Sequence, residues 1–158
     1  MSDYIKEKGV GFTGHRELQD ETLIRYKLDE VVSDLIFNGY ERFFAGGAKG
    51  FDMLAAESVI MNKKKYPDVK LDIILPYKDY TKYWDSNCVS RFNKICENAD
   101  KVEYISDIYW RGCIQKRNRE LMDRSSICVC YLIKKCGGTV YTVECARKKQ
   151  IQIINLFE

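Results

Sequence analysis

The chain has 158 residues, of which 46% are hydrophobic and 31% are charged. This composition excludes intrinsic disorder and is typical of a globular protein with a buried core, so we expect one domain over residues 1–158. The formal net charge of +3 is too small to predict nucleic-acid or membrane binding through bulk charge. Function should therefore depend on a local site.

Targeting and redox signals point to the cytoplasm. Residues 1–8 are polar and charged, unlike a signal peptide, and no apolar run approaches the roughly 18 residues that span a bilayer. Seven cysteines form an odd set without CxxC spacing, beside a single histidine. We therefore predict free, mostly buried thiols, no metal site and no membrane partner. Cys128 and Cys130 lie two apart in an apolar run and should share one face of a strand.

Short apolar runs alternate with longer amphipathic segments along the whole chain. The pattern predicts strands at 10–12, 42–45, 71–75, 101–105, 127–132 and 151–156, and helices at 20–38, 51–65, 91–98, 110–125 and from the last glycine turn to 149. Pro76 is expected to close the third strand, and 77–90 to form a loop rich in aromatic residues leading into a helix near 91. The strict alternation predicts an α/β fold of three layers, in which helices cover both faces of a mainly parallel sheet.

Three glycine-bearing turns follow predicted strands, at the edge where open parallel sheets bind ligands. They are residues 11–14, 46–50 and 137–139, each followed by a helix. Glycine lets the backbone approach a ligand, and the free N–H groups and positive dipole of a helix start favour phosphate. Tight turns also use glycine for backbone reasons alone, but three turns at one edge favour a phosphate site. The second turn has neither the GxxxxGK[ST] nor the GxGxxG spacing, so neither an ordinary ATPase nor an ordinary dehydrogenase is predicted.

Five segments, in the same order, resemble the YpsA-like branch of the SLOG superfamily. They are GFTGHR at 11–16, GGAKGFDMLAAE at 46–57, LPY at 75–77, Arg117-Asn118, and GGT at 137–139 followed by Thr142 and Ala146. SLOG domains are Rossmann-like modules that bind nucleotides or nucleotide-derived ligands, and their relatives include the lonely-guy phosphoribohydrolases and the DNA-processing protein DprA. The resemblance implies a nucleotide or ADP-ribose-like small molecule as partner, bound by a sensor or carrier, and it implies no cofactor.

The motifs imply a set of ligand-binding residues from all five segments. They are Thr13, Gly14, His15, Arg16, Gly46, Gly47, Ala48, Asp52, Pro76, Tyr77, Arg117, Asn118, Gly137, Gly138 and Thr139. Some have structural alternatives: His15 as a structural hydrogen-bonding residue, and Asp52 as a helix cap instead of a partner for a ribose hydroxyl. The aromatic residues after the third strand could stack on a base or pack their loop onto the sheet.

An enzyme is the main alternative to a binding protein. Lonely-guy enzymes carry an Arg-Lys pair and a later PGGxGTxxE motif, and here Arg117-Asn118 and 137–144 occupy the corresponding places. A nucleotide N-glycosidic-bond hydrolase would use Arg117 to orient the phosphate and Glu144 to act at the sugar. Cys136, Val140 and Tyr141 replace the proline, third glycine and threonine of the motif. These departures favour binding over hydrolysis, and a protein-interaction module with a vestigial pocket is a second alternative.

The distribution of charge bears on larger partners. The basic clusters at 63–65 and 147–149 are interpreted as solvated helix ends. No basic stripe of the kind that binds DNA is present, which argues against a nucleic-acid partner despite the DprA relatives. Related domains often pair through helices, so the resemblance implies a possible homo-oligomer.

Overall fold

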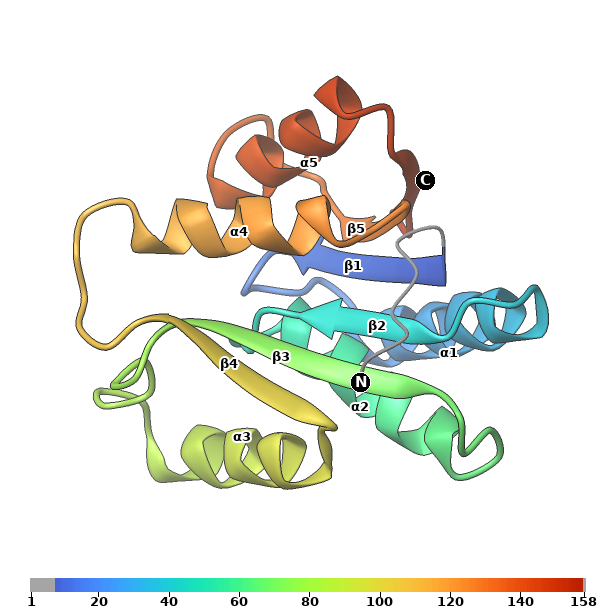
Figure 1. Cartoon of the computed structure of the whole chain (residues 1–158), viewed down its shortest axis with the longest axis horizontal. Helices are drawn as coiled ribbons and strands as arrows, with labels where there is room; N and C mark the ends of the chain where they lie inside the picture. The colour runs from blue at the N-terminus through green and yellow to red at the C-terminus, as the bar shows by residue number, and fades with distance from the viewer. Residues whose placement is uncertain (1–7, 158) are drawn as a thin grey trace.

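The computed structural model describes residues 8–157, which form one six-stranded sheet and five helices (Figure 1). The strands are β1 (Gly9–Gly14), β2 (Arg42–Ala45), β3 (Lys70–Tyr77), β4 (Lys101–Ser106), β5 (Ile127–Tyr131) and β6 (Gln152–Asn155). The helices are α1 (Glu21–Phe37), α2 (Phe51–Lys63), α3 (Ser86–Asn98), α4 (Cys113–Asp123) and α5 (Gly138–Lys148). A signal peptide over residues 1–8 was rejected on sequence grounds. Residues 1–7 of that segment lie outside the described part of the chain.

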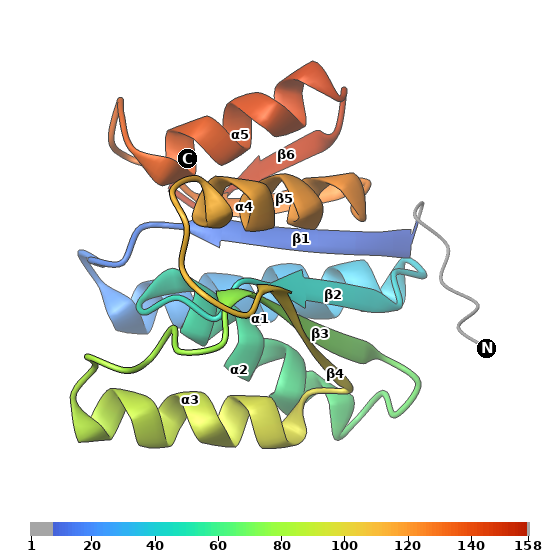
Figure 2. The same cartoon turned by 60° about the vertical axis from the view of Figure 1, so that its left-hand side comes forward.

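The strands lie in the order β4-β3-β2-β1-β5-β6, and every neighbouring pair is parallel. From β1 to β4 the chain builds the sheet in one direction, and it then crosses to the other side of β1 to add β5 and β6. The two edge strands are visible beside α3 and α5 in Figure 2. The switch in direction lies between β1 and β5, whose paired residues run from Val10–Ile127 to Gly14–Tyr131. The Rossmann-like α/β prediction is confirmed.

Alternate residues of the buried strands enter two separate cores. Phe43, Ile73 and Val129 pack in the core that α1, α2 and α3 cover, whereas Phe44 and Cys128 pack in the core under α4 and α5. In Figure 1, α4 lies in front of the sheet and α1 and α2 lie behind it. Helices therefore cover both faces, as the apolar strands predicted, and the two cysteines of β5 share one face.

The seven cysteines are free thiols, but they differ in exposure. Cys113, Cys128 and Cys130 are buried and Cys136 is exposed, with the other three between these limits, so "mostly buried" was too strong. Within residues 8–157, no helix is both long and apolar enough to cross a bilayer. The same residues contain no group of three or more His, Cys, Asp or Glu side chains that could hold a metal ion.

Several predicted boundaries differ from those of the structure, and two of the differences have an identifiable reason. Strand β3 continues through Pro76. Its pairing with β2 ends at Ile73, and its register with β4 passes from Leu75 to Tyr77 without Pro76, so the missing N–H of the proline costs no ladder hydrogen bond. Helix α3 begins at Ser86, within the predicted loop, because the Asp85 carboxylate accepts a 2.9 Å hydrogen bond from the N–H of Cys88 and caps the helix.

Candidate functional site

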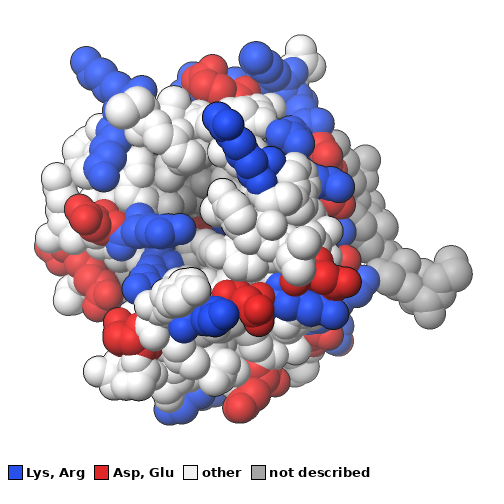
Figure 3. Space-filling model, turned by 90° about the vertical axis from the view of Figure 1, so that its left-hand side faces the viewer, with Lys and Arg blue, Asp and Glu red and all other residues white. Residues whose placement is uncertain are grey.

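A cleft of about 440 Å³ opens at the carboxyl ends of β1 and β5, where the direction of strand addition switches. Its walls come from the turn after β1, the starts of α2 and α5, the inner face of α4, and Tyr80. Figure 3 looks onto this edge of the sheet and shows the hollow. Eleven of the predicted ligand residues line it: Thr13, Gly14, His15, Arg16, Ala48, Asp52, Arg117, Asn118, Gly137, Gly138 and Thr139.

The other predicted residues lie outside the lining. Gly46 and Gly47 are buried behind the cleft, and Pro76 lies within β3, while Tyr77 packs edge-on against Tyr80. Glu144 is exposed on α5, where it forms a 3.4 Å ion pair with Arg147. The structure therefore does not bring Glu144 and the buried Arg117 into one cleft, although the hydrolase hypothesis needs both at the sugar.

Other lining residues were absent from the predicted set, among them Glu17, Tyr80, Lys134 and Cys136. Tyr80 was considered only as one member of an aromatic stretch, and Cys136 only as a departure from a motif. Lys134 carried a usable signal, because it lies between a predicted central strand and a glycine turn and so had to reach the same sheet edge. Glu17 gave no such signal, since an exposed acid in a loop is ordinary.

The start of α5 presents an open helix N-terminus to the cleft. Its N-cap, Gly137, has a φ of 114° and provides no side-chain cap. Helix geometry leaves the N–H groups of Gly138, Thr139 and Val140 without intrahelical acceptors. A Cβ on Gly138 would meet no atom of the described part of the chain within 4 Å, and this glycine does not have a positive φ. Neither packing nor backbone conformation within the protein explains a glycine at 138.

The glycines of the other two turns have internal reasons. A Cβ on Gly14 would overlap the ring of Phe51, and one on Gly46 would lie 2.8 Å from a guanidinium nitrogen of Arg117. Gly47 and Gly50 have φ values of 73° and 82°, a region that side-chain-bearing residues rarely adopt. Packing and backbone conformation explain these glycines, and a positive φ explains Gly137, whereas neither explains Gly138.

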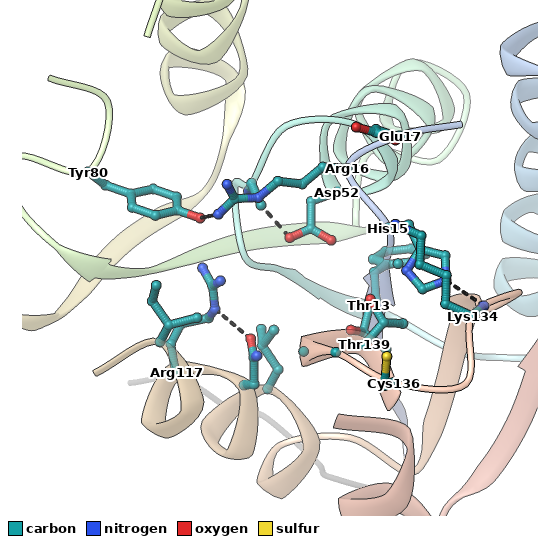
Figure 4. A pocket seen from close by; sticks show the side chains of 18 residues that line it. Thr13, His15, Arg16, Glu17, Asp52, Tyr80, Arg117, Lys134, Cys136 and Thr139 are labelled. Atoms are coloured by element: carbon teal, nitrogen blue, oxygen red, sulfur yellow. Dashed lines mark hydrogen bonds between the residues drawn. The ribbon is translucent and has the colours of Figure 1, made fainter. Parts of the chain in front are cut away.

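Two buried, oppositely charged side chains form the floor of the cleft (Figure 4). Arg117 is only 3% exposed. Its guanidinium donates to the carbonyl oxygens of Gly46 and Ile74 and, at 2.8 Å, to the side-chain oxygen of Asn118. Asp52, in the first turn of α2, is 6% exposed. Burial raises the pKa of Asp52 to about 6 even though the charge of Arg117 opposes the rise.

His15 has the structural role that the sequence left open. Its Nε2 accepts hydrogen bonds from the N–H groups of Ile133 and Lys134, at 3.0 and 3.2 Å, so the ring proton is assigned to Nδ1. Burial, assisted by the charge of Lys134, lowers the pKa of His15. A neutral His15 thus ties the turn after β1 to the loop that leads into α5, and holds the cleft's two sides together.

Long cationic side chains from two loops lie at the mouth of the cleft. Arg16 and Lys134 are exposed there, and Arg16 donates to the hydroxyl of Tyr80 at 3.5 Å. With the buried Arg117, three cations line the cleft against two carboxylates, Glu17 and Asp52. Figure 3 shows basic side chains beside the hollow. An anion would enter a region of net positive charge next to a helix N-terminus.

Comparisons with known proteins agree with this architecture. The model of the YspA SLOG family matches residues 10–156. A UPF0398 protein of Halalkalibacterium halodurans is 30% identical over 149 residues, covering 92% of this chain and 77% of the relative. The SPbeta prophage-derived protein YoqJ of Bacillus subtilis is 28% identical over 139 residues, covering 79% of this chain and 81% of that protein.

Solved structures of DNA processing protein A (DprA) have the same fold. The Streptococcus pneumoniae protein aligns with a TM-score of 0.68 at 16% identity, covering 94% of this chain and 50% of its own. The Helicobacter pylori protein, whose structure concerns a single-stranded DNA binding mode, aligns with a TM-score of 0.66 at 19% identity, covering 92% and 63%. The chain therefore spans about half to two thirds of these DprA chains.

The Helicobacter pylori structure corrects one prediction. The small net charge and the lack of a basic stripe were taken to argue against a nucleic-acid partner, yet a protein with this fold binds single-stranded DNA. Net charge averages over a whole surface, while a strand of nucleic acid contacts only a local groove. A value of +3 is therefore no ground for excluding such a partner.

Proposed function

The chain belongs to the YpsA family of the SLOG superfamily, and we propose that its cleft binds the phosphate of a nucleotide or nucleotide-derived ligand at the start of α5, as a sensor or carrier. One observation carries the proposal: Gly138 opens onto empty space at an uncapped helix N-terminus and has no packing or conformational reason to be glycine. A close approach by a ligand explains that choice of residue.

The surrounding side chains support an anion at this place. Thr13 and Thr139 are largely buried, and both line the cleft beside the uncapped amides. Lys134 and Arg16 add positive charge from the two loops at the mouth. Backbone amides, hydroxyl groups and flexible cations are together the usual groups that bind a phosphate.

A substitution that adds charge without altering the fold tests the proposal. Gly138→Asp places a carboxylate in the open space, where it repels phosphate but suits the start of a helix. We expect ADP-ribose, NAD or a nucleoside monophosphate to raise the thermal midpoint of the wild-type chain; a ligand at 100 times its Kd adds about 2.7 kcal/mol of stability. Gly138→Asp should abolish the shift.

The matched control is Ser86→Asp, which adds a carboxylate at the exposed start of α3, outside the cleft. It should retain the full ligand-dependent shift. No shift with any of these nucleotides in the wild-type chain would contradict the proposal, as would an unchanged shift in Gly138→Asp. Mass spectrometry of the incubated ligand separates binding from hydrolysis, since a hydrolase releases free base.

Single-stranded DNA is a second candidate, favoured by the DprA-like fold together with a row of aromatic side chains. Tyr80 in the cleft wall contacts Tyr77, which contacts Tyr109, with ring centroids 5.6 and 5.5 Å apart. Tyr109 and Trp110 are 60% and 41% exposed and could stack on bases beyond a phosphate held in the cleft. Fluorescence anisotropy with a labelled oligonucleotide tests this: Trp110→Ala should weaken binding, and equal binding by the variant would exclude the stacking role.

A further inference from the structure

We propose that Asp52 makes the cleft selective for a ribose hydroxyl, so that it binds a ribose 5-phosphate unit more tightly than its deoxy counterpart. This inference rests on the proposed phosphate site and adds the chemical class of the group next to the phosphate.

The Asp52 carboxylate is buried with few partners. Among residues 8–157 its one hydrogen bond comes from the N–H of Ala48, at 3.3 Å to Oδ2. Asp52 forms no ion pair within 4 Å among the described residues, although the charges of Arg117 and Arg16 both act on its carboxylate. A carboxylate accepts about four hydrogen bonds, and a buried one with so few is costly to retain. Asp52 lines the cleft, where a ligand can supply further donors to its carboxylate.

The position of Asp52 relative to the phosphate site limits what that donor can be. In Figure 4, Asp52 lies with Arg16 and Tyr80 toward one side of the cleft, and Thr13, Thr139 and Cys136 lie toward the other. A phosphate at the start of α5 would leave the next part of the ligand facing Asp52. That part must donate hydrogen bonds and cannot be a second anion at this carboxylate. In a nucleotide, the group that follows the 5′-phosphate is a ribose, whose hydroxyls are neutral donors.

Arg117 and Gly46 hold this arrangement in place. The carbonyl oxygens of Gly46 and Ile74 and the Asn118 side chain fix the guanidinium, which lies over the Tyr80 ring at 5.7 Å. A Cβ on Gly46 would lie 2.9 Å from Asp52 Oδ2 as well as 2.8 Å from the Arg117 nitrogen. The glycine thus makes room for both charged groups, and Arg117 acts as a positioning residue whose charge favours the ionised form of Asp52.

Binding measurements on the full chain with base-free probes test the inference. Ribose 5-phosphate should bind about 10- to 100-fold more tightly than 2-deoxyribose 5-phosphate, the effect of one hydrogen bond to a charged acceptor. The same comparison of AMP with 2′-deoxy-AMP and 3′-deoxy-AMP identifies the hydroxyl. In Asp52→Asn the preference should fall to about threefold or less. Glu21→Gln, which neutralises the first-turn acid of α1 outside the cleft, should keep it.

The outcomes separate this inference from the proposed function. Equal binding of the ribose and both deoxy forms by the wild-type chain overturns the role of Asp52 and leaves the phosphate site standing. A full preference retained in Asp52→Asn has the same consequence. Failure of every phosphorylated probe to bind overturns both.

Discussion

The turn between β2 and α2 and the turn between β5 and α5 look alike in sequence, but glycine serves different purposes in them. In the first, Gly46, Gly47 and Gly50 are required by contacts or positive φ within the protein. In the second, a Cβ added to Gly138 would meet no atom of the described residues within 4 Å. The comparison teaches that a glycine-rich turn is evidence for a ligand only where the protein's own atoms leave the glycine unexplained.

The largest effect is expected at Gly50. Its φ is 82°, and a Cβ there would overlap the backbone carbonyl of Arg16. Because backbone atoms cannot rotate away, Gly50→Ala should lower the free energy of unfolding by about 3 kcal/mol or more, combining strained φ with overpacking. Urea denaturation measures the loss. A variant as stable as the wild type would show that this turn, too, has room for a side chain.

The next largest effect, of opposite sign, is expected at Asp52. The pKa of this carboxyl is about 6 in the folded protein against 3.8 ordinarily, so the folded state binds more protons between these values and Asp52 costs stability as the pH rises through them. Asp52→Asn should therefore be more stable than the wild type at pH 7, by up to about 3 kcal/mol.

The pH dependence of that difference provides the control. The gap between Asp52→Asn and the wild type should shrink as the pH falls from about 6 to 4, because the wild-type carboxyl becomes neutral. Arg117 and Arg16 face this carboxyl, and His15, Glu17 and Lys134 also line the cleft. All five are common to both proteins, so they do not produce the difference. A gap that is absent at pH 7, or constant from pH 4 to 7, contradicts the cost assigned to the buried charge.

A smaller effect on stability is expected at Gly138. Alanine fits the open space and is the better helix former, so Gly138→Ala should leave stability unchanged or raise it by about 0.5–1 kcal/mol. Affinity for ribose 5-phosphate should fall, because the methyl group occupies the ligand's approach. Urea denaturation and a binding titration on the same preparation measure the stability and the affinity. If Gly138→Ala is destabilised, position 138 does not differ from position 50 in its tolerance of a side chain.

The smallest effect is expected at Glu144. Its side chain is exposed and, among residues 8–157, pairs only with Arg147, three residues along the helix. Glu144→Gln should change the free energy of unfolding by less than about 0.5 kcal/mol and should leave phosphate affinity unaltered. Calorimetric titration with ribose 5-phosphate measures this affinity. A clear loss of affinity in Glu144→Gln would show that Glu144 contributes to ligand binding.

Much of the fold could be predicted because alternation of apolar strands and amphipathic helices is local information. The site was less accessible. Residue 144 follows the glycine turn closely in sequence, but α5 buries positions 139, 142, 143 and 146, and that helical period turns Glu144 outward. Likewise, the difference between Gly46 and Gly138 depends on Arg117, which arrives from a helix 71 residues along the chain from Gly46. Such contacts leave no mark in the local pattern.

The most direct test of the central claim is a ¹H–¹⁵N NMR titration of the full chain with ribose 5-phosphate. If the start of α5 holds the phosphate, the amide signals of Gly138, Thr139 and Val140 should show the largest saturable shifts, and Gly138→Asp should abolish them. Saturable shifts confined to the starts of α2 or α4, with the α5 amides unmoved, would contradict the account.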